Sequence, residues 1–205
     1  ASSQGRQIGQ RGPGLRLVLA SSSPRRREVL ASLRLEFEVL HTDVDETRLP
    51  DEPAMAYVER VARSKAQAVD AGDDVVVAAD TAVVLEGKVL GKPAHPEEAR
   101  SMLRRLQGTR HEVLTGLAVR LGDSTHSLVE STDVEMGVMT EDEIAAYVDG
   151  GEPMDKAGAY ALQGEGGVFV VGVNGSPSNV IGLPVHLLPR LFGRLGIDLS
   201  GFRSR

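Results

Sequence analysis

A short polar segment between a predicted strand and a predicted helix carries an anion-binding pattern. The sequence SSSPRR (21–26) follows the apolar run LRLVLA (15–20) and contains Ser21, Arg25 and Arg26. The first N–H groups of a helix lack partners within the helix and carry a partial positive charge. The parallel N–H donors of an arginine guanidinium group match the geometry of phosphate oxygens. The residues alone leave two interpretations open, a phosphate cradle and an ordinary helix start with solvated arginines.

Carboxylates form the second candidate group. Asp45 lies in an acidic turn (43–46), and Asp80 closes the apolar run VVVAA (75–79). Carboxylates at strand ends can hold Mg²⁺ or Mn²⁺ while substrate phosphates complete the coordination shell, and they can activate water. The acidic turn fits a solvated loop equally well. For Asp80, the other interpretation is an N-cap or turn residue bonded to Thr81. A functional role is favoured over it, because a charge that ends a wholly apolar strand indicates a function.

Lysines and a glycine-rich stretch form the third group. Lys65 lies on a predicted helix, Lys92 follows Gly91, and the stretch DKAGAYALQG (155–164) contains Gln163. Each lysine alone is typical of a protein surface, and the glycine-rich stretch fits a simple connection. A triphosphate, however, needs several cations besides a metal ion, and small residues allow a base to approach the backbone.

The predicted elements that position these residues alternate between strands and helices and also include hairpins. Buried runs and turn signals predict strands, while capping residues and apolar periodicity predict helices. Strands are predicted at 15–20, 35–40, 75–79, 83–85, 89–90, 113–121, 128–138 and 168–173, and helices at 24–33 and 53–71 and from about 95, 140 and 184. The pattern predicts an α/β protein with a mixed sheet.

Length and composition limit the class of protein. The chain has 205 residues, 41% hydrophobic and 25% charged, which predicts one domain over residues 15–205. The polar, glycine-rich residues 1–14 are expected to be a disordered tail or a cloning remnant. A net charge of −6 argues against a nucleic-acid surface. Apolar runs far shorter than 18 residues predict no membrane span. The absence of cysteine is compatible with a reducing compartment, and we expect a cytoplasmic protein.

Four ordered motifs resemble the Maf family of nucleotide pyrophosphatases, also described as septum-formation inhibitors. They are LASSSPRRREVL (19–30), VVVAADTAVVLEGKVLGKP (75–93), EPMDKAGAYALQGEGGVFV (152–170) and NVIGLP (179–184). The resemblance extends over about residues 15–195. It implies an elongated α/β fold with a mixed sheet and a deep central cleft, shared in outline with the inosine-triphosphate pyrophosphatases. It also implies hydrolysis of the α–β phosphoanhydride of nucleoside triphosphates with a divalent cation, Mg²⁺ or Mn²⁺, and homodimers are common in the family.

The resemblance also assigns roles to residues. Asp80 matches the catalytic base, and Asp80 and Asp45 match positions near the metal, although many relatives carry Glu where Asp45 stands. The positions matched on the phosphate side are Ser21, Arg26, Lys65 and Lys92. The positions linked to substrate choice are Arg25, Thr81 and Gln163. This combination resembles the branch that acts on dTTP, UTP and modified pyrimidine nucleotides.

Two other functions remain open at this stage. One is a nucleotide-binding regulator of cell division and septum formation with little turnover. The other is an enzyme of the same class that prefers purines. The products formed from a panel of nucleotides would distinguish both functions from an enzyme that prefers pyrimidine nucleotides.

Overall fold

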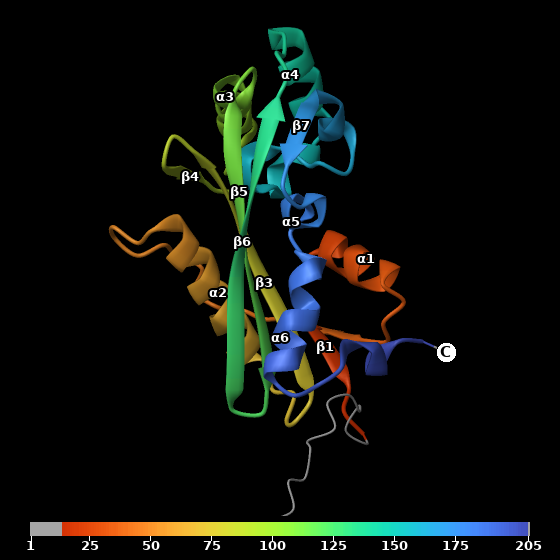
Figure 1. The fold of residues 1–205 in the computed structure, drawn as a ribbon. Coiled ribbons are helices and arrows are strands. Elements are labelled where there is room, and N and C mark those ends of the chain that lie inside the picture. The colour runs from red at the N-terminus through yellow and green to blue at the C-terminus, as the bar shows by residue number, and fades with distance from the viewer. Residues whose placement is uncertain (1–13, 205) are drawn as a thin grey trace, which may run out of the picture.

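The computed structural model describes residues 14–204 and shows an elongated molecule (Figure 1). A long hairpin formed by strands β5 (Arg110–Leu121) and β6 (Ser124–Met136) runs through most of its length, with α2 (Ala54–Ala68) on one side and α1 (Pro24–Ser32) and α6 (Leu188–Arg194) on the other. Helices α3 (Pro96–Leu106) and α4 (Glu141–Asp149) and strand β7 (Val170–Asn174) lie together at one end. The prediction for residues 1–14 lies outside the described residues, except for Gly14.

The described residues form a seven-stranded mixed sheet in the order β2-β1-β3-β5-β6-β7, with β4 paired to β3. Strands β2, β1 and β3 are parallel, and the other pairs are antiparallel. The strands are β1 (Leu17–Ala20), β2 (Glu38–Leu40), β3 (Val75–Leu85), β4 (Lys88–Leu90), β5 (Arg110–Leu121), β6 (Ser124–Met136) and β7 (Val170–Asn174). The predicted mixed α/β sheet is confirmed.

Three helices begin where capping residues predict them. Ser23 caps α1, His95 caps α3, and Thr140 forms a capping box with Glu143 at α4. The described helices are α1 (Pro24–Ser32), α2 (Ala54–Ala68), α3 (Pro96–Leu106), α4 (Glu141–Asp149), α5 (Pro177–Ile181) and α6 (Leu188–Arg194). Helix α5 and the 3₁₀ turns between residues 152 and 169 were not predicted, because they are too short to show an apolar period.

Strand β3 corrects one prediction. We predicted a strand that ends at Asp80 and a separate strand at 83–85, but β3 is continuous from Val75 to Leu85. Its neighbour β5 pairs with it along nearly the whole length, and Asp80 lies opposite Gly116. Because of this long-range pairing, the strand continues past the polar residues Asp80 and Thr81, and Asp80 lies in the middle of a strand.

Side chains along β3 alternate between the two faces of the sheet. Residues 75, 77 and 79 pack with α1 and α6, while 76 and 78 pack against α2. Farther along, residues 83 and 85 join a core with α3 and α4, while 82 and 84 contact the start of α2. Asp80 and Thr81 lie between these apolar clusters. Asp80 therefore points toward α2, and Thr81 points to the opposite face.

One edge of β3 is left open beside these two residues. Strand β1 pairs with β3 from Val75 to Val77, and β4 pairs with it from Val83 onward. In the part of the chain that the structure describes, no strand pairs with β3 on this edge between Val77 and Val83. Side chains from both faces of the sheet can therefore reach one common space at this gap.

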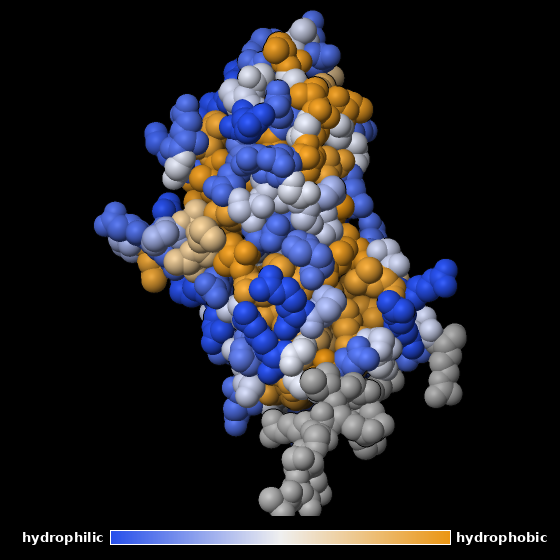
Figure 2. Space-filling view, in the orientation of Figure 1, coloured by the Kyte–Doolittle hydropathy of each residue, from blue (hydrophilic) through white to orange (hydrophobic). Residues whose placement is uncertain are grey.

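The surface at the far end of the molecule is apolar around the edge strand β7 (Figure 2). Val138, Val168 and Val171 are exposed there. These residues lie on or beside the last strand of the sheet, away from the gap in β3.

Gly116 lets α2 lie directly on the sheet, and its replacement tests this packing. A Cβ at Gly116 would lie 2.2 Å from the carbonyl oxygen of Val58 on α2. We expect Gly116→Ala to lower the free energy of unfolding by about 1–3 kcal/mol, as overpacking does, measured by urea denaturation. Gly193→Ala is the control, because a Cβ at Gly193 in α6 meets nothing within 4 Å. It should leave stability unchanged or slightly raised. Equal stability of the two variants would contradict the close packing.

Candidate active site

A cavity of about 490 Å³ opens at the gap beside β3. Its lining comes from the β1–α1 loop, α2, the middle of β3, the segment after β4 and residues 155–161. The predicted site residues that it brings together are Ser21, Arg25, Arg26, Lys65, Asp80, Thr81 and Lys92. These residues are far apart in the sequence, and the sheet gap is what assembles them.

A buried ion pair forms part of the cavity wall. Lys65 Nζ is 2.7 Å from Asp80 Oδ1 and 2.9 Å from Glu46 Oε1. Asp80 is 5% exposed and Lys65 is 7% exposed. A buried charge requires a partner, because desolvation costs several kcal/mol. The lysine is therefore held between two carboxylates, one on β3 and one in the loop after β2.

Burial raises the pKa of Asp80, while the nearby charges of Lys65 and then Arg26 oppose the rise. On the same wall, burial together with the charges of Asp80 and Glu46 raises the pKa of Tyr57 to about 12. Asp80 therefore holds protons more tightly than an ordinary aspartate. Tyr57 keeps its proton and remains a hydrogen-bond donor.

Arg26 connects three elements at the other side of the cavity. Its Nε donates to Gly182 O at 2.8 Å, its Nη2 to Thr81 Oγ1 at 3.0 Å and its Nη1 to Ser21 Oγ at 3.4 Å. Burial lowers the pKa of Arg26, and the charges of Asp80 and Glu46 oppose this. Arg26 is thus fixed in the wall of the cavity and is not a solvated arginine at a helix start.

Two predicted residues lie outside the cavity lining. Asp45 is exposed, its Oδ1 accepts the backbone N–H of Thr47 at 2.8 Å, and bonds from the side chain and backbone of Thr47 lower its pKa. The neighbouring Glu46 lines the cavity instead. Gln163 is also exposed, and the part of its motif that lines the cavity ends at Ala161.

The sequence predicted an acidic cluster that includes Glu46 but did not single Glu46 out, and Tyr57 was missed as a cavity residue. Glu46 belongs to the acidic turn, but nothing in the sequence shows which carboxylate of the turn faces inward. Tyr57 and Lys65 are eight residues apart on α2, with Val61 between them. Residues four apart lie on one helix face, so this spacing was a usable signal for Tyr57.

One part of the remaining wall is mostly apolar. Ala157, Tyr160, Ala161, Val180 and Ile181 line it. Such a wall suits a flat organic ring, while the arginines and lysines suit phosphates.

Tyr160 contacts His111. Its hydroxyl is 2.7 Å from His111 Nε2, and burial lowers the pKa of His111 to about 4. His111 is therefore neutral near pH 7.

The carboxylates at the cavity fit a divalent cation that takes much of its shell from substrate. Asp80 and Glu46 both line the cavity and offer hard oxygen ligands. Within residues 14–204 there is no group of three or more acidic or histidine side chains placed to hold a metal ion. Mg²⁺ typically uses one or two carboxylates and completes its shell with water and phosphate oxygens.

Comparison with known proteins identifies the family. A family model described as Maf-like protein matches residues 16–195. The chain belongs to the Maf family.

Relatives of this Maf protein carry names that state an activity. A protein of Anaeromyxobacter dehalogenans (strain 2CP-C), named dTTP/UTP pyrophosphatase, is 55% identical over 188 residues, covering 90% of this chain and 96% of the relative. A protein of Myxococcus xanthus with the same name is 49% identical over 185 residues, covering 89% and 94%. One from Shigella sonnei, also so named, is 51% identical over 174 residues, covering 82% and 87%.

Two solved structures are similar to this chain over part of its length. The Ham1 protein of Staphylococcus aureus matches with a TM-score of 0.44 and 19% identity, covering 60% of this chain and 72% of that chain. A HAM1 protein from Coxiella burnetii matches with a TM-score of 0.42 and 17% identity, covering 60% and 73%. Separately, none of the described helices has the length and apolar character needed to cross a membrane.

The pairing of Lys65 with Asp80 gives a prediction about proton binding. The ammonium group opposes the effect of burial on Asp80, so Lys65→Met should raise the pKa of Asp80 further. Carbon-13 NMR titration of the aspartate carboxyls measures this, and Asp80→Asn assigns the signal. Lys88→Met, at an exposed position on β4, should leave the titration unchanged. An unmoved Asp80 titration in Lys65→Met would contradict the described pair.

Proposed function

We propose that this Maf protein hydrolyses nucleoside triphosphates at the α–β phosphoanhydride, with dTTP and UTP as preferred substrates and a monophosphate and pyrophosphate as products. The observation that carries the proposal is the buried Asp80 carboxylate, 2.7 Å from Lys65 Nζ, in the wall of a cavity that is also lined by two arginines and two further lysines. The names of the relatives support the choice of dTTP and UTP.

Asp80 is the base in this proposal. Its raised pKa lets it accept a proton from water that attacks the α-phosphorus. Lys65 fixes one carboxylate oxygen by its bond to Oδ1, which leaves the other oxygen to orient the water. Arginines and lysines in the wall neutralise the phosphates and the leaving pyrophosphate, so much of the rate gain is electrostatic and positional.

A divalent cation, Mg²⁺ or Mn²⁺, completes the proposed site. Asp80 is its proposed ligand together with a carboxylate of the acidic turn, Asp45 or Glu46. The resemblance favours Asp45, whereas the cavity lining favours Glu46. When bound, the cation would supply positive charge at the phosphate oxygens and lower the pKa of coordinated water.

Substrate choice is assigned to Arg25, Thr81 and Gln163 by the resemblance. Arg25 and Thr81 line the cavity and are therefore in reach of a bound nucleotide. Gln163 would have to turn inward from its exposed position when substrate binds. A cytoplasmic location, a homodimer and a link to septum formation also remain part of this proposal.

Asp80→Asn tests the proposed base. The amide keeps the shape of the side chain but cannot accept the proton, so we expect kcat to fall by about 10²–10⁴-fold, the typical contribution of a general base. Steady-state kinetics with UTP measure this, and circular dichroism checks the fold. Asp70→Asn, at an exposed position after α2, is the matched control and should keep normal turnover. Near-normal kcat in folded Asp80→Asn would remove Asp80 as the base.

A nucleotide panel tests the reaction and the branch. Pyrophosphate release should occur with dTTP and UTP and require Mg²⁺ or Mn²⁺, and it should be weak with CTP, GTP, ITP and 7-methyl-GTP. Release from a purine nucleotide alone would keep the reaction but overturn the pyrimidine assignment. Tight nucleotide binding without release would favour the regulator of cell division.

A further inference from the structure

A line of hydrogen bonds leads from the cavity into the core. Arg26 Nη2 donates to Thr81 Oγ1 at 3.0 Å, Thr81 Oγ1 is 3.0 Å from Thr115 Oγ1, and Thr115 Oγ1 donates to the carbonyl oxygen of Asn179 at 3.0 Å. The line crosses from β3 to β5 and ends at α5. Only its first members, Arg26 and Thr81, line the cavity. Thr115 and Asn179 are fully buried.

The two ends of this line fix the direction of every bond in it. Arginine can only donate, and a carbonyl oxygen can only accept. The single hydroxyl hydrogen of Thr115 is therefore used toward Asn179, because otherwise two acceptors would face each other at 3.0 Å. Thr115 must then accept the hydroxyl hydrogen of Thr81. Thr81 Oγ1 has no hydrogen left to offer and presents only a lone pair to the cavity.

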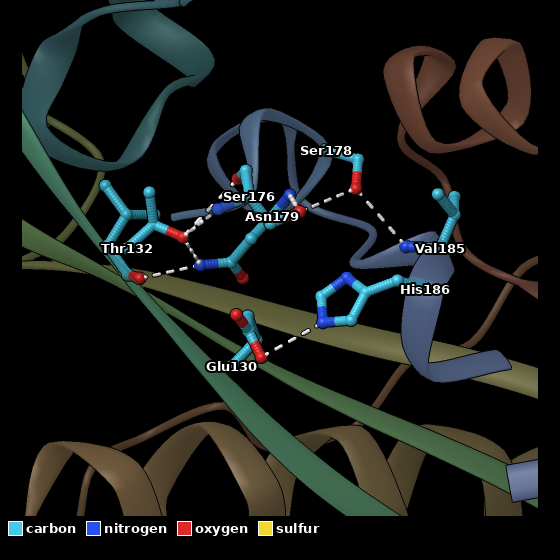
Figure 3. Close-up of polar contacts among 8 residues, drawn as sticks. Glu130, Thr132, Ser176, Ser178, Asn179, Val185 and His186 are labelled. Atoms are coloured by element: carbon cyan, nitrogen blue, oxygen red, sulfur yellow. Dashed lines mark hydrogen bonds and ion pairs between the residues drawn. The ribbon is translucent and has the colours of Figure 1, made fainter. Parts of the chain in front are cut away.

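The end of the line is anchored by the side chain of Asn179 (Figure 3). Its Nδ2 donates to Val113 O at 2.9 Å and to Thr132 Oγ1 at 3.0 Å. Thr132 Oγ1 also accepts the backbone N–H of Ser176 at 3.0 Å. The start of α5 is thus tied to β5 and β6, and the carbonyl of Asn179 is held in place against Thr115.

We propose that Thr115 and Asn179 are positioning residues that keep the Thr81 hydroxyl an obligate hydrogen-bond acceptor in the cavity. A ligand group that meets this oxygen must then be a donor. Phosphate oxygens are acceptors and do not qualify. Uracil and thymine present a ring N3–H, whereas cytosine presents a bare N3 acceptor at the same position. The line of bonds therefore selects dTTP and UTP against CTP, an inference that rests on the proposed function.

Thr115→Val tests the inference because it removes the hydroxyl and keeps the shape. The carbonyl of Asn179 still accepts the N–H of Gly182 at 2.9 Å, so no buried acceptor is left bare. The Thr81 hydroxyl becomes free to rotate and to donate. Thr115→Ser retains the hydroxyl and is the conservative variant. Thr125→Val is the matched control, since the buried Thr125 Oγ1 on β6 has no hydrogen-bond partner among the described residues.

The measurement is the ratio of kcat/KM for UTP to kcat/KM for CTP. We expect this ratio to fall roughly tenfold in Thr115→Val, about the effect of one neutral hydrogen bond. The loss should come mainly from faster CTP turnover. Thr115→Ser and Thr125→Val should keep the ratio of the unmodified chain.

A purely structural role of Thr115 would lower both rates in parallel and leave the ratio unchanged, and that result overturns the inference. If Thr115→Val does not fold, the pair Thr81→Val and Thr81→Ser replaces it, and only the valine variant should lose the preference. An unmodified chain that hydrolyses UTP and CTP equally overturns the inference and leaves the reaction standing. A chain that hydrolyses neither nucleotide contradicts the proposed function itself.

Discussion

The buried ion pair between Asp80 and Lys65 is the interaction on which the rest of the structure depends. Two charges removed from water are tolerated only when they are close together and well bonded, so α2 must lie tightly on the sheet at this point. Gly116, opposite Asp80 on β5, permits that approach because it has no side chain. The close packing of α2 on the sheet and the pairing of the two buried charges therefore depend on each other.

The continuity of β3 explains how one short segment serves two sides of the cavity. Asp80 and Thr81 are neighbours in a strand, so they point to opposite faces of the sheet. Asp80 meets Lys65 of α2 and Thr81 meets Arg26 of α1, and the unpaired edge between β1 and β4 opens both faces to the same cavity. A buried carboxylate and a buried arginine thereby face the same cavity without a flexible loop between them.

Local signals predicted most of the helices and strands, because capping and turn residues act over a few positions. The break predicted at Asp80 was wrong because pairing with β5, more than thirty residues away, outweighs two polar residues in a strand. Among the candidate site residues, those predicted on regular elements, such as Lys65 on a helix and Asp80 at a strand, do line the cavity. In the acidic turn, sequence alone did not show that Glu46 lies at the cavity and Asp45 outside its lining, since side-chain direction in a loop depends on distant contacts.

The direct test of the proposed chemistry follows the oxygen atom of the attacking water. UTP is hydrolysed by the unmodified chain in ¹⁸O-labelled water with Mg²⁺, and the products are analysed by mass spectrometry. Attack at the α-phosphorus predicts one ¹⁸O atom in the monophosphate and none in the pyrophosphate. Label in the pyrophosphate, or orthophosphate as the first product, would contradict the account of how this cavity acts on a nucleotide.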